Sequence, residues 1–324
     1  MLDKIRRKLL MYIVRYTRHS VVYNMLYPSW WHAMYFKSFG KKINYLSAIP
    51  NRGAGIGHQM ANWIAGYWFA QKFNLKFAHI PFSTREWDDF LNFGDNEVTV
   101  NELLNAKYKK VRLPLFNEND EKELKIIGQI IQSYSNEKVV FVLEQDQFYY
   151  KQYEVMDDLK VKFKKAHDDT NLIYDKDTLN IAVHVRRGDI TIGQLNKNPN
   201  LLIRWQDNDY FVNVLKNVLR NLKSSKPIKV YLFSQGKIED FSEFKDIKNV
   251  QYCLDMDAKS SFLHMVYADI LITSKSSFSY KPALLSDGLK ICPDNFWHGY
   301  PLSDNWLIAD EKGEFDTEKL QKWV

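Results

Sequence analysis

The chain has 324 residues, of which 45% are hydrophobic and 26% are charged, and its net charge is +6. This composition is ordinary for a soluble globular protein, excludes a disordered chain, a collagen and a disulfide-rich miniprotein, and at this length predicts about two domains. The charge is uneven, because residues 1–42 carry +8 whereas the rest of the chain, at −2, is close to neutral. General binding of nucleic acid by the body of the chain is therefore not expected.

Residues 1–42 form a basic segment of their own. Leu2, Ile5, Leu9, Ile13 and Tyr16 follow helical spacing, with lysines and arginines beside them. No run reaches the roughly 18 uncharged apolar residues of a membrane span, and the pattern of a signal peptide is missing. We expect a basic amphipathic helix that lies on an anionic membrane surface, or else a helix packed on the globular body.

Strand-like and helix-like segments alternate in the next block, residues 43–166. The expected strands are 43–49, 75–80 and 138–143, and the expected helices are 59–73, 121–134 and 151–166. Such alternation predicts an α/β domain with a parallel sheet. The polar, acid-rich stretch 167–178 is then expected to be a linker.

The alternation resumes in residues 179–324. The expected strands are 179–185, 228–233, 250–254, 269–273 and 290–292, and the expected helices are 209–221, 260–267 and 278–286. The fold class that follows is α/β, with two Rossmann-like parallel-sheet domains that face a cleft. In such sheets ligands bind beyond the carboxyl ends of the strands.

The strongest cluster of polar residues follows the apolar run that ends at residue 183. It reads His184-Val-Arg186-Arg187-Gly188-Asp189 and stands at the carboxyl end of an expected strand. Two guanidinium groups offer paired donors to phosphate oxygens, and Asp189 can orient one of them. Gly188 would permit a tight turn. The alternative is a surface arginine pair with a salt bridge.

Gly53, Gly55 and Gly57 lie between the first expected strand and the helix that follows. Glycines let a ligand or another backbone approach closely, and bare amides at a helix start attract anions. The spacing is G-x-G-x-G rather than G-x-G-x-x-G, no acid ends the next strand, and no G-K-[ST] follows, so nicotinamide-dinucleotide and Walker sites are not expected. A ligand-facing loop and a plain tight turn both remain open.

A serine-rich run, residues 274–280, follows an expected strand and opens an expected helix. One serine is expected to cap that helix. Four hydroxyl groups exceed this need, so the run is expected to bind a ligand such as a phosphate.

No metal site is expected. The D-x-D pattern occurs three times, close to what chance gives in this composition, and neither H-E-x-x-H nor G-x-S-x-G occurs. Cys253 and Cys292 are too few for a disulfide framework or a four-ligand zinc site, and both lie in apolar stretches, which predicts buried free thiols.

The three clusters, in this order, resemble motifs of the GDP-fucose-dependent fucosyltransferases of the α1,2, α1,6 and protein O-fucosyl type. Gly55-x-Gly57-His58-Gln59 resembles the family's glycine loop, residues 184–189 resemble its H-x-R-R-x-D signature, and residues 276–279 resemble its serine motif. The resemblance implies a GT-B architecture, GDP-fucose as donor, inversion at the anomeric carbon, and neither a metal nor another cofactor.

The resemblance also implies roles for individual residues. Arg186 would hold the β-phosphate, and the remaining donor-binding residues would be Gly55, Gly57, His184, Arg187, Asp189, Asp255 or Asp257, Ser276, Ser277 and Phe278. Two positions depart from the family. His58 replaces the usual Asn or Cys, and Gln194 stands where the α1,6 enzymes have a glutamate. The catalytic base is therefore expected to be His58, with Asp189 and Glu144 as the next candidates.

The resulting expectation is a bacterial-type fucosyltransferase that builds a surface glycan. It would be cytoplasmic and peripheral on the inner face of the membrane, with residues 1–42 on the anionic surface and a glycan acceptor that can be lipid-linked. Two alternatives stay open: a GT-B enzyme that uses another nucleotide sugar, and a non-catalytic protein that binds a nucleotide or a glycan.

Overall fold

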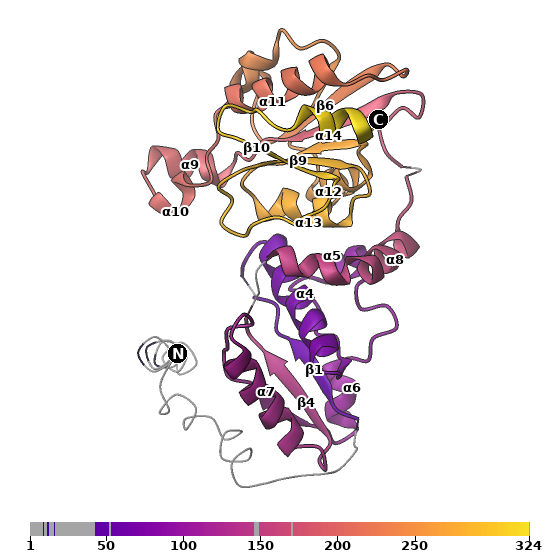
Figure 1. Cartoon of the computed structure of the whole chain (residues 1–324), viewed down its shortest axis with the longest axis vertical. Coiled ribbons are helices and arrows are strands. Elements are labelled where there is room, and N and C mark those ends of the chain that lie inside the picture. Colours follow the sequence, from indigo (N-terminus) through magenta and orange to yellow (C-terminus); the bar gives the residue numbers. More distant parts are fainter. Residues whose placement is uncertain are drawn as a thin grey trace. The chain divides into compact units, whose positions relative to one another are not determined.

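The computed structural model describes residues 43–51, 53–145, 149–169 and 171–323, together with Leu9, Tyr12 and Tyr16. These residues divide into two compact units (Figure 1). The first holds the described residues up to Ala54, His58–Asp88 and those from Gly94 to residue 145, and the second holds Gly55–Gly57, Asp89–Phe93 and everything from residue 149 onward. The expected amphipathic helix of residues 1–42 lies outside the described residues, apart from the three named, and stays a prediction. No described helix is long and apolar enough to cross a membrane.

The first unit is a four-stranded parallel sheet with the strand order β2-β1-β4-β3. Its strands are β1 (Tyr45–Ala48), β2 (Lys76–Phe77), β3 (Lys109–Arg112) and β4 (Val139–Leu143), and its helices are α4 (Ile56–Lys72), α5 (Arg85–Leu91), α6 (Val100–Asn105) and α7 (Glu121–Ser133), of which α4 begins and α5 ends in the second unit. Every residue of β4 is buried. Gly66 lets α4 lie directly on β1, because a Cβ at this position would come within 2.4 Å of the Ala48 Cβ.

The second unit is a six-stranded parallel sheet with the order β10-β9-β8-β5-β6-β7. Its strands are β5 (Leu179–His184), β6 (Ile228–Ser234), β7 (Val250–Leu254), β8 (Ile270–Ile272), β9 (Leu289–Pro293) and β10 (Trp306–Ala309). The chain runs outward from β5 through β6 to β7, then returns to the other side of β5 and continues through β8 to β10. The strand order therefore reverses between β5 and β8.

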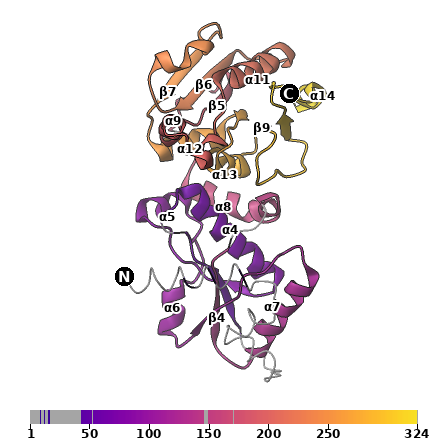
Figure 2. The ribbon, with the colours of Figure 1, turned by 90° about the vertical axis from the view of Figure 1, so that its left-hand side faces the viewer.

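Helices cover both faces of this sheet, with α11 and α14 on one face and α12 and α13 on the other (Figures 1 and 2). The helical segments are η1 (Tyr149–Val155), α8 (Met156–Ala166), α9 (Asp189–Leu195), α10 (Pro199–Leu202), α11 (Asn208–Asn221), η2 (Ile238–Phe244), α12 (Ala258–Tyr267), α13 (Ser277–Leu285) and α14 (Thr317–Trp323). Phe211, Val214, Leu215 and Val218 of α11 are fully buried at helical spacing, and each such side chain contributes about 1.5–3 kcal/mol of hydrophobic free energy.

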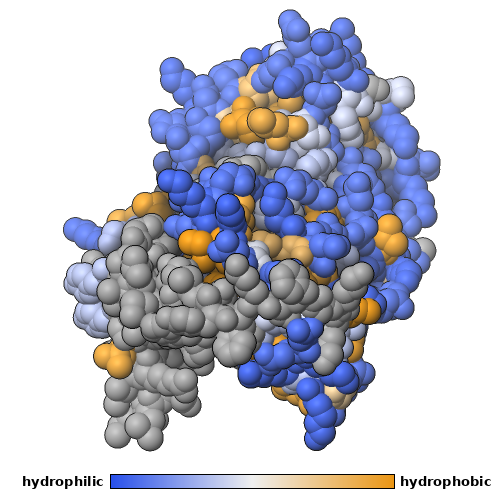
Figure 3. All heavy atoms as spheres, turned by 60° about the horizontal axis from the view of Figure 1, so that its bottom comes forward, coloured by the Kyte–Doolittle hydropathy of each residue, from blue (hydrophilic) through white to orange (hydrophobic). Residues whose placement is uncertain are grey.

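On the face shown in Figure 3, hydrophilic side chains dominate and apolar ones form small separate patches.

The two parallel sheets with their helices confirm the predicted α/β class with two parallel-sheet domains, and every predicted strand is present with its bounds shifted by a few residues. Cys253 and Cys292 are buried and free, as expected. The first unit, however, ends well before residue 166. Helix α8 belongs to the second unit, because its Phe163 packs against Phe262 of α12 at 6.1 Å between ring centroids, and its Lys160 pairs with Asp287 at 2.8 Å.

Candidate functional site

The reversal of strand order between β5 and β8 marks the place where an open parallel sheet of this kind binds ligands. His184 is the last residue of β5, and Ser274 follows β8 on the other side of the reversal. The His184 Nδ1 and Ser274 Oγ atoms lie 2.8 Å apart, so a hydrogen bond joins the two loops. Two of the three predicted clusters therefore meet at this point.

His184 is a neutral imidazole in this site. Burial lowers its pKa to about 3, and the positive charges of Arg186 and Arg187 act in the same direction. The ring of Phe278, at the start of α13, lies 5.6 Å from the His184 ring. His184 can therefore hold a polar ligand group by hydrogen bonding but carries no charge to offer a phosphate.

Arg186 is held in position by Asp189, and the distance between its Nη2 and the carboxylate Oδ1 is 2.6 Å. The Arg186 side chain keeps 27% of its surface exposed, so other N–H groups of the guanidinium face solvent. Gly188 forms the tight turn between them with a φ of +73°, and a Cβ there would come within 2.1 Å of the Gln235 Oε1. The predicted orienting role of Asp189 and the predicted turn are confirmed.

Arg187 differs from its neighbour, because its guanidinium is almost wholly engaged inside the protein. Its Nη1 donates to the Arg186 carbonyl at 2.8 Å, its Nη2 donates to Asn208 Oδ1, and the group lies over the Trp205 ring at 4.1 Å from the centroid. Only 7% of the residue is exposed. Burial lowers the pKa of Arg187 to about 10, opposed by the nearby carboxylates of Asp207, Glu243 and Asp240.

Asn208 extends this arrangement to η2. Its Nδ2 donates to the Asp240 carbonyl at 2.7 Å and to Glu243 Oε2 at 2.9 Å. The hydrogen bond from Asn208 lowers the pKa of Glu243. Sequence reasoning missed Trp205, which precedes α11, and Asn208, which is its first residue. The polar run there gives no sign of being buried.

The serine segment is used mainly within its own loop. Ser276 Oγ accepts from the Phe278 amide at 3.2 Å and caps α13, as predicted for one serine. Ser279 Oγ accepts from the Ser274 amide at 3.3 Å. Ser276 and Ser277 are both buried. The number of hydroxyl groups is therefore explained in large part by the loop itself, and the structure leaves a phosphate at this helix start as a proposal.

Gly57 lies against the serine segment, within the second unit. A Cβ at Gly57 would come within 2.8 Å of the Ser277 Cβ, carbonyl carbon and carbonyl oxygen, so the predicted close approach of another backbone is confirmed here. A Cβ at Gly55 would meet no other atom within 4 Å. Helix α4 starts at Ile56, three residues earlier than expected, which makes His58 a half-buried residue of its first turn.

Gln59 of the same motif acts within the first unit. Its Nε2 donates to the Ala54 carbonyl at 2.9 Å and to Ser83 Oγ at 2.8 Å, and its Oε1 accepts from the Ser83 amide at 2.9 Å. This side chain therefore has a structural role, because it ties the glycine loop to the segment that precedes α5.

Two of the three remaining predicted carboxylates, Asp257 and Glu144, have partners of their own. Asp257 Oδ2 accepts from the Ser260 amide at 3.0 Å and caps α12, which lowers the pKa of Asp257. Asp255 is exposed and follows β7 with a φ of +52°, so it is the better placed of the two to contact a ligand. Glu144, which follows β4, forms an ion pair with Arg112.

A cavity of about 600 Å³ opens on this edge of the sheet, within the range of small-molecule sites. Arg187, Gly188, Asn208 and Gln235 are among its lining residues. Among the residues that the structure describes, no three His, Cys, Asp or Glu side chains are grouped so as to hold a metal ion.

Comparison with known proteins gives distant matches only. No family model and no curated protein matches the chain. Among solved structures, POFUT1 in complex with GDP is 14% identical with a TM-score of 0.42 over 74% of this chain and 94% of that one. Fucosyltransferase NodZ from Bradyrhizobium is 12% identical with a TM-score of 0.42 over 76% of this chain and 94% of that one. A second NodZ structure, an α-1,6-fucosyltransferase co-crystallized with GDP, is 11% identical with a TM-score of 0.43 over 85% and 98%. Likeness at this level transfers neither substrate nor site residues to this chain.

Proposed function

We propose that the chain is a glycosyltransferase that moves a sugar from a nucleoside-diphosphate donor to a glycan hydroxyl, and that the donor is GDP-fucose. One observation carries the proposal: at the strand-order reversal, the partly exposed guanidinium of Arg186 is fixed by Asp189 beside the neutral, buried His184. A fixed guanidinium with outward N–H groups fits two phosphate oxygens. The choice of GDP-fucose rests on the resemblance of the H-x-R-R-x-D run and its two companion motifs.

The chemistry of transfer explains why such an arginine matters. When the bond to the diphosphate breaks, negative charge grows on the phosphate oxygen, and the sugar acquires oxocarbenium character. A guanidinium that is already oriented stabilises this charge more in the transition state than in the ground state, and losing a contact of this kind costs about 3–4 kcal/mol. Arg186 would supply this stabilisation without a metal ion, and the acceptor would attack with inversion.

His58 is the proposed base. Gln194 cannot take a proton, and the carboxylates of Asp189 and Glu144 already accept from Arg186 and Arg112. A neutral imidazole can accept the proton of the acceptor hydroxyl late in the reaction.

Thermal-shift measurements with GDP, UDP and CMP at equal concentrations test the donor. GDP should raise the melting temperature most, and a preference for UDP would exclude the fucosyltransferase interpretation. Release of GDP from GDP-fucose then separates an enzyme from a binding protein. Activity should survive EDTA, whereas a loss that Mn²⁺ restores would contradict the proposed mechanism.

We also propose that residues 1–42 bring the enzyme to the cytoplasmic face of a membrane, where acceptors for surface glycans are lipid-linked. Their charge of +8 supports this role. A chain without these residues should bind anionic liposomes more weakly and keep its hydrolysis of the donor. A folded truncated chain that binds liposomes as before would remove the membrane role.

A further inference from the structure

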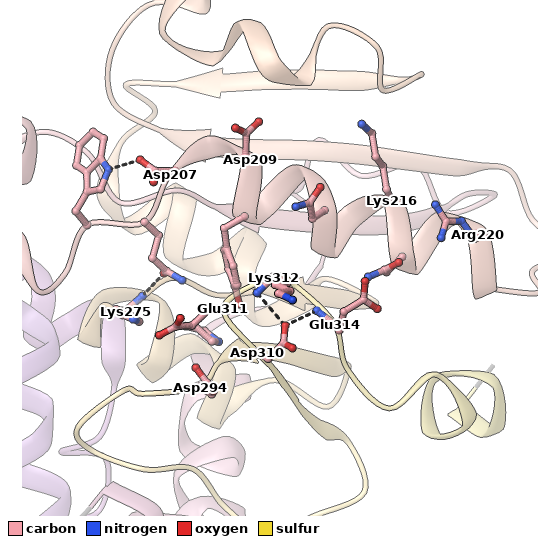
Figure 4. Close-up of a pocket in the computed structure, with 16 residues that line it drawn as sticks. Asp207, Asp209, Lys216, Arg220, Lys275, Asp294, Asp310, Glu311, Lys312 and Glu314 are labelled. Atoms are coloured by element: carbon pink, nitrogen blue, oxygen red, sulfur yellow. Dashed lines mark hydrogen bonds between the residues drawn. The ribbon is translucent and has the colours of Figure 1, made fainter.

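A second, larger cavity, of about 760 Å³, lies in the second unit beside the proposed donor site. One wall is the exposed stripe of α11 that carries Asp209, Asn213, Lys216 and Arg220, and the other is the segment 310–314 that follows β10 (Figure 4). The size is within the range of sites that enclose small ligands.

This cavity shares a wall with the donor site. Lys275 lines it and stands in the serine segment, directly after the residue that binds His184. The Lys275 amide donates to Gln206 Oε1 at 2.9 Å, which joins the serine segment to the residues before α11. Trp205, whose ring covers Arg187, lines both cavities. A ligand here would therefore lie next to the place where the sugar is transferred.

The charges around the cavity are mixed and unpaired with one another. Six acidic and four basic side chains line it, yet no ion pair within 4.0 Å joins any two of them in the described part of the chain. They are Asp207, Asp209, Lys216, Arg220, Lys275, Asp294, Asp310, Glu311, Lys312 and Glu314. Carboxylates only accept hydrogen bonds, and ammonium or guanidinium groups only donate them. The cavity therefore offers a ligand hydrogen-bond acceptors and hydrogen-bond donors on different side chains.

A polyhydroxylated ligand fits this lining best, because each hydroxyl both donates and accepts. A polyanion is disfavoured by the six carboxylates, and a small cation by the four bases. Trp205 and Tyr210 add aromatic surface for the apolar face of a sugar ring.

We propose that this cavity binds carbohydrate and holds a sugar unit of the acceptor glycan while another unit receives the transferred sugar. The identification of the carbohydrate as the acceptor rests on the proposed function. The binding of carbohydrate itself does not.

The test uses the full chain with saturating GDP on a printed array of neutral and amino-sugar oligosaccharides, followed by titration calorimetry with the glycan bound best. The double variant Lys216→Glu/Arg220→Glu should weaken that affinity at least 10-fold and leave the affinity for GDP unchanged. Asn213→Trp, which fills the cavity without changing charge, should do the same. Lys319→Glu/Lys322→Glu is the matched control, because it makes the same charge change on exposed positions of α14 outside the cavity, and it should bind as the unaltered chain.

Binding of no glycan on the array, or equal affinity in all four proteins, would overturn the proposal. Consumption of GDP-fucose by the same samples keeps the two proposals apart. If the cavity variants lose the glycan but no protein consumes GDP-fucose, the carbohydrate site stands and the proposed function fails. If GDP-fucose is consumed and the acceptor KM is the same in the cavity variants and the control, the function stands and the site is refuted.

Discussion

The two adjacent arginines should give opposite results when each is replaced by lysine. Lysine keeps the positive charge but loses the planar fork and its stacking surface. In Arg187→Lys the lost interactions are a hydrogen bond to Asn208 or to the Arg186 carbonyl and the contact with Trp205. A hydrogen bond from a charged group is worth about 1.5–3 kcal/mol and such a stacked contact about 0.5–2 kcal/mol, so we expect a loss of about 2–5 kcal/mol of stability.

Arg186→Lys should leave stability nearly unchanged. Arg186 is partly exposed, and its pairing with Asp189 is the kind of surface ion pair that contributes about 0–1 kcal/mol. Its proposed contact with the diphosphate depends on the fork, so the affinity for GDP should fall about 10- to 100-fold, which corresponds to about 1.4–2.8 kcal/mol.

Thermal unfolding and titration with GDP, both at pH 7.5, measure the two effects on the same samples. In a unit of this size a loss of 1 kcal/mol lowers Tm by about 2–4 °C, so Arg187→Lys should melt roughly 4–20 °C lower and Arg186→Lys within about 4 °C of the unaltered chain. If Arg187→Lys keeps its Tm and loses GDP as strongly as Arg186→Lys does, Arg187 contacts the ligand itself, and its structural role is refuted.

Three further predictions concern the other clusters. Burial lowers the pKa of His184 to about 3, so below about pH 6.5 the unfolded chain binds a proton that the folded chain does not. This residue should therefore make the free energy of unfolding fall by about 1.4 kcal/mol per pH unit as the pH drops below about 6.5. In denaturant titrations between pH 6.5 and 5, the free energy of unfolding of His184→Asn should depend less steeply on pH. Gly57→Ala should lose about 1–3 kcal/mol through its clash with Ser277, whereas Gly55→Ala, with open space, should be tolerated; equal Tm values would contradict the close approach. His58→Asn should keep the affinity for GDP and lose turnover, and a variant with near-normal kcat would exclude His58 as the base.

The sequence predicted those parts of the site that are formed by residues close together in the chain. The turn at Gly188, the pairing of Arg186 with Asp189 and the serine cap of α13 all join residues two or three apart. Their chemistry can be seen in a short window of sequence. The same holds for β5, β6, β8 and β9, whose buried apolar runs can be recognised in the sequence.

Other features depend on contacts that no window contains. Trp205 and Asn208 reach Arg187 across 18 and 21 residues, so the burial of that arginine appears only in three dimensions. Strand β3 was missed because a single residue, Val111, is buried in it, which leaves no apolar pattern. Helices α9 and α10 have 7 and 4 residues, too short for a helical period to stand out.

The separation of the two arginines also explains how adjacent cations can share one loop. The charge of Arg187 is compensated within the protein by the carboxylates of Asp207, Asp240 and Glu243, while Arg186 pairs with Asp189. Each arginine therefore has its own carboxylates, which reduces the repulsion between the two positive charges. The buried Arg187 also donates a hydrogen bond to the Arg186 carbonyl and so fixes the backbone from which the Arg186 side chain extends. A guanidinium held in this way needs little reorganisation when charge develops on a leaving phosphate, which is the condition under which electrostatic stabilisation lowers a barrier most.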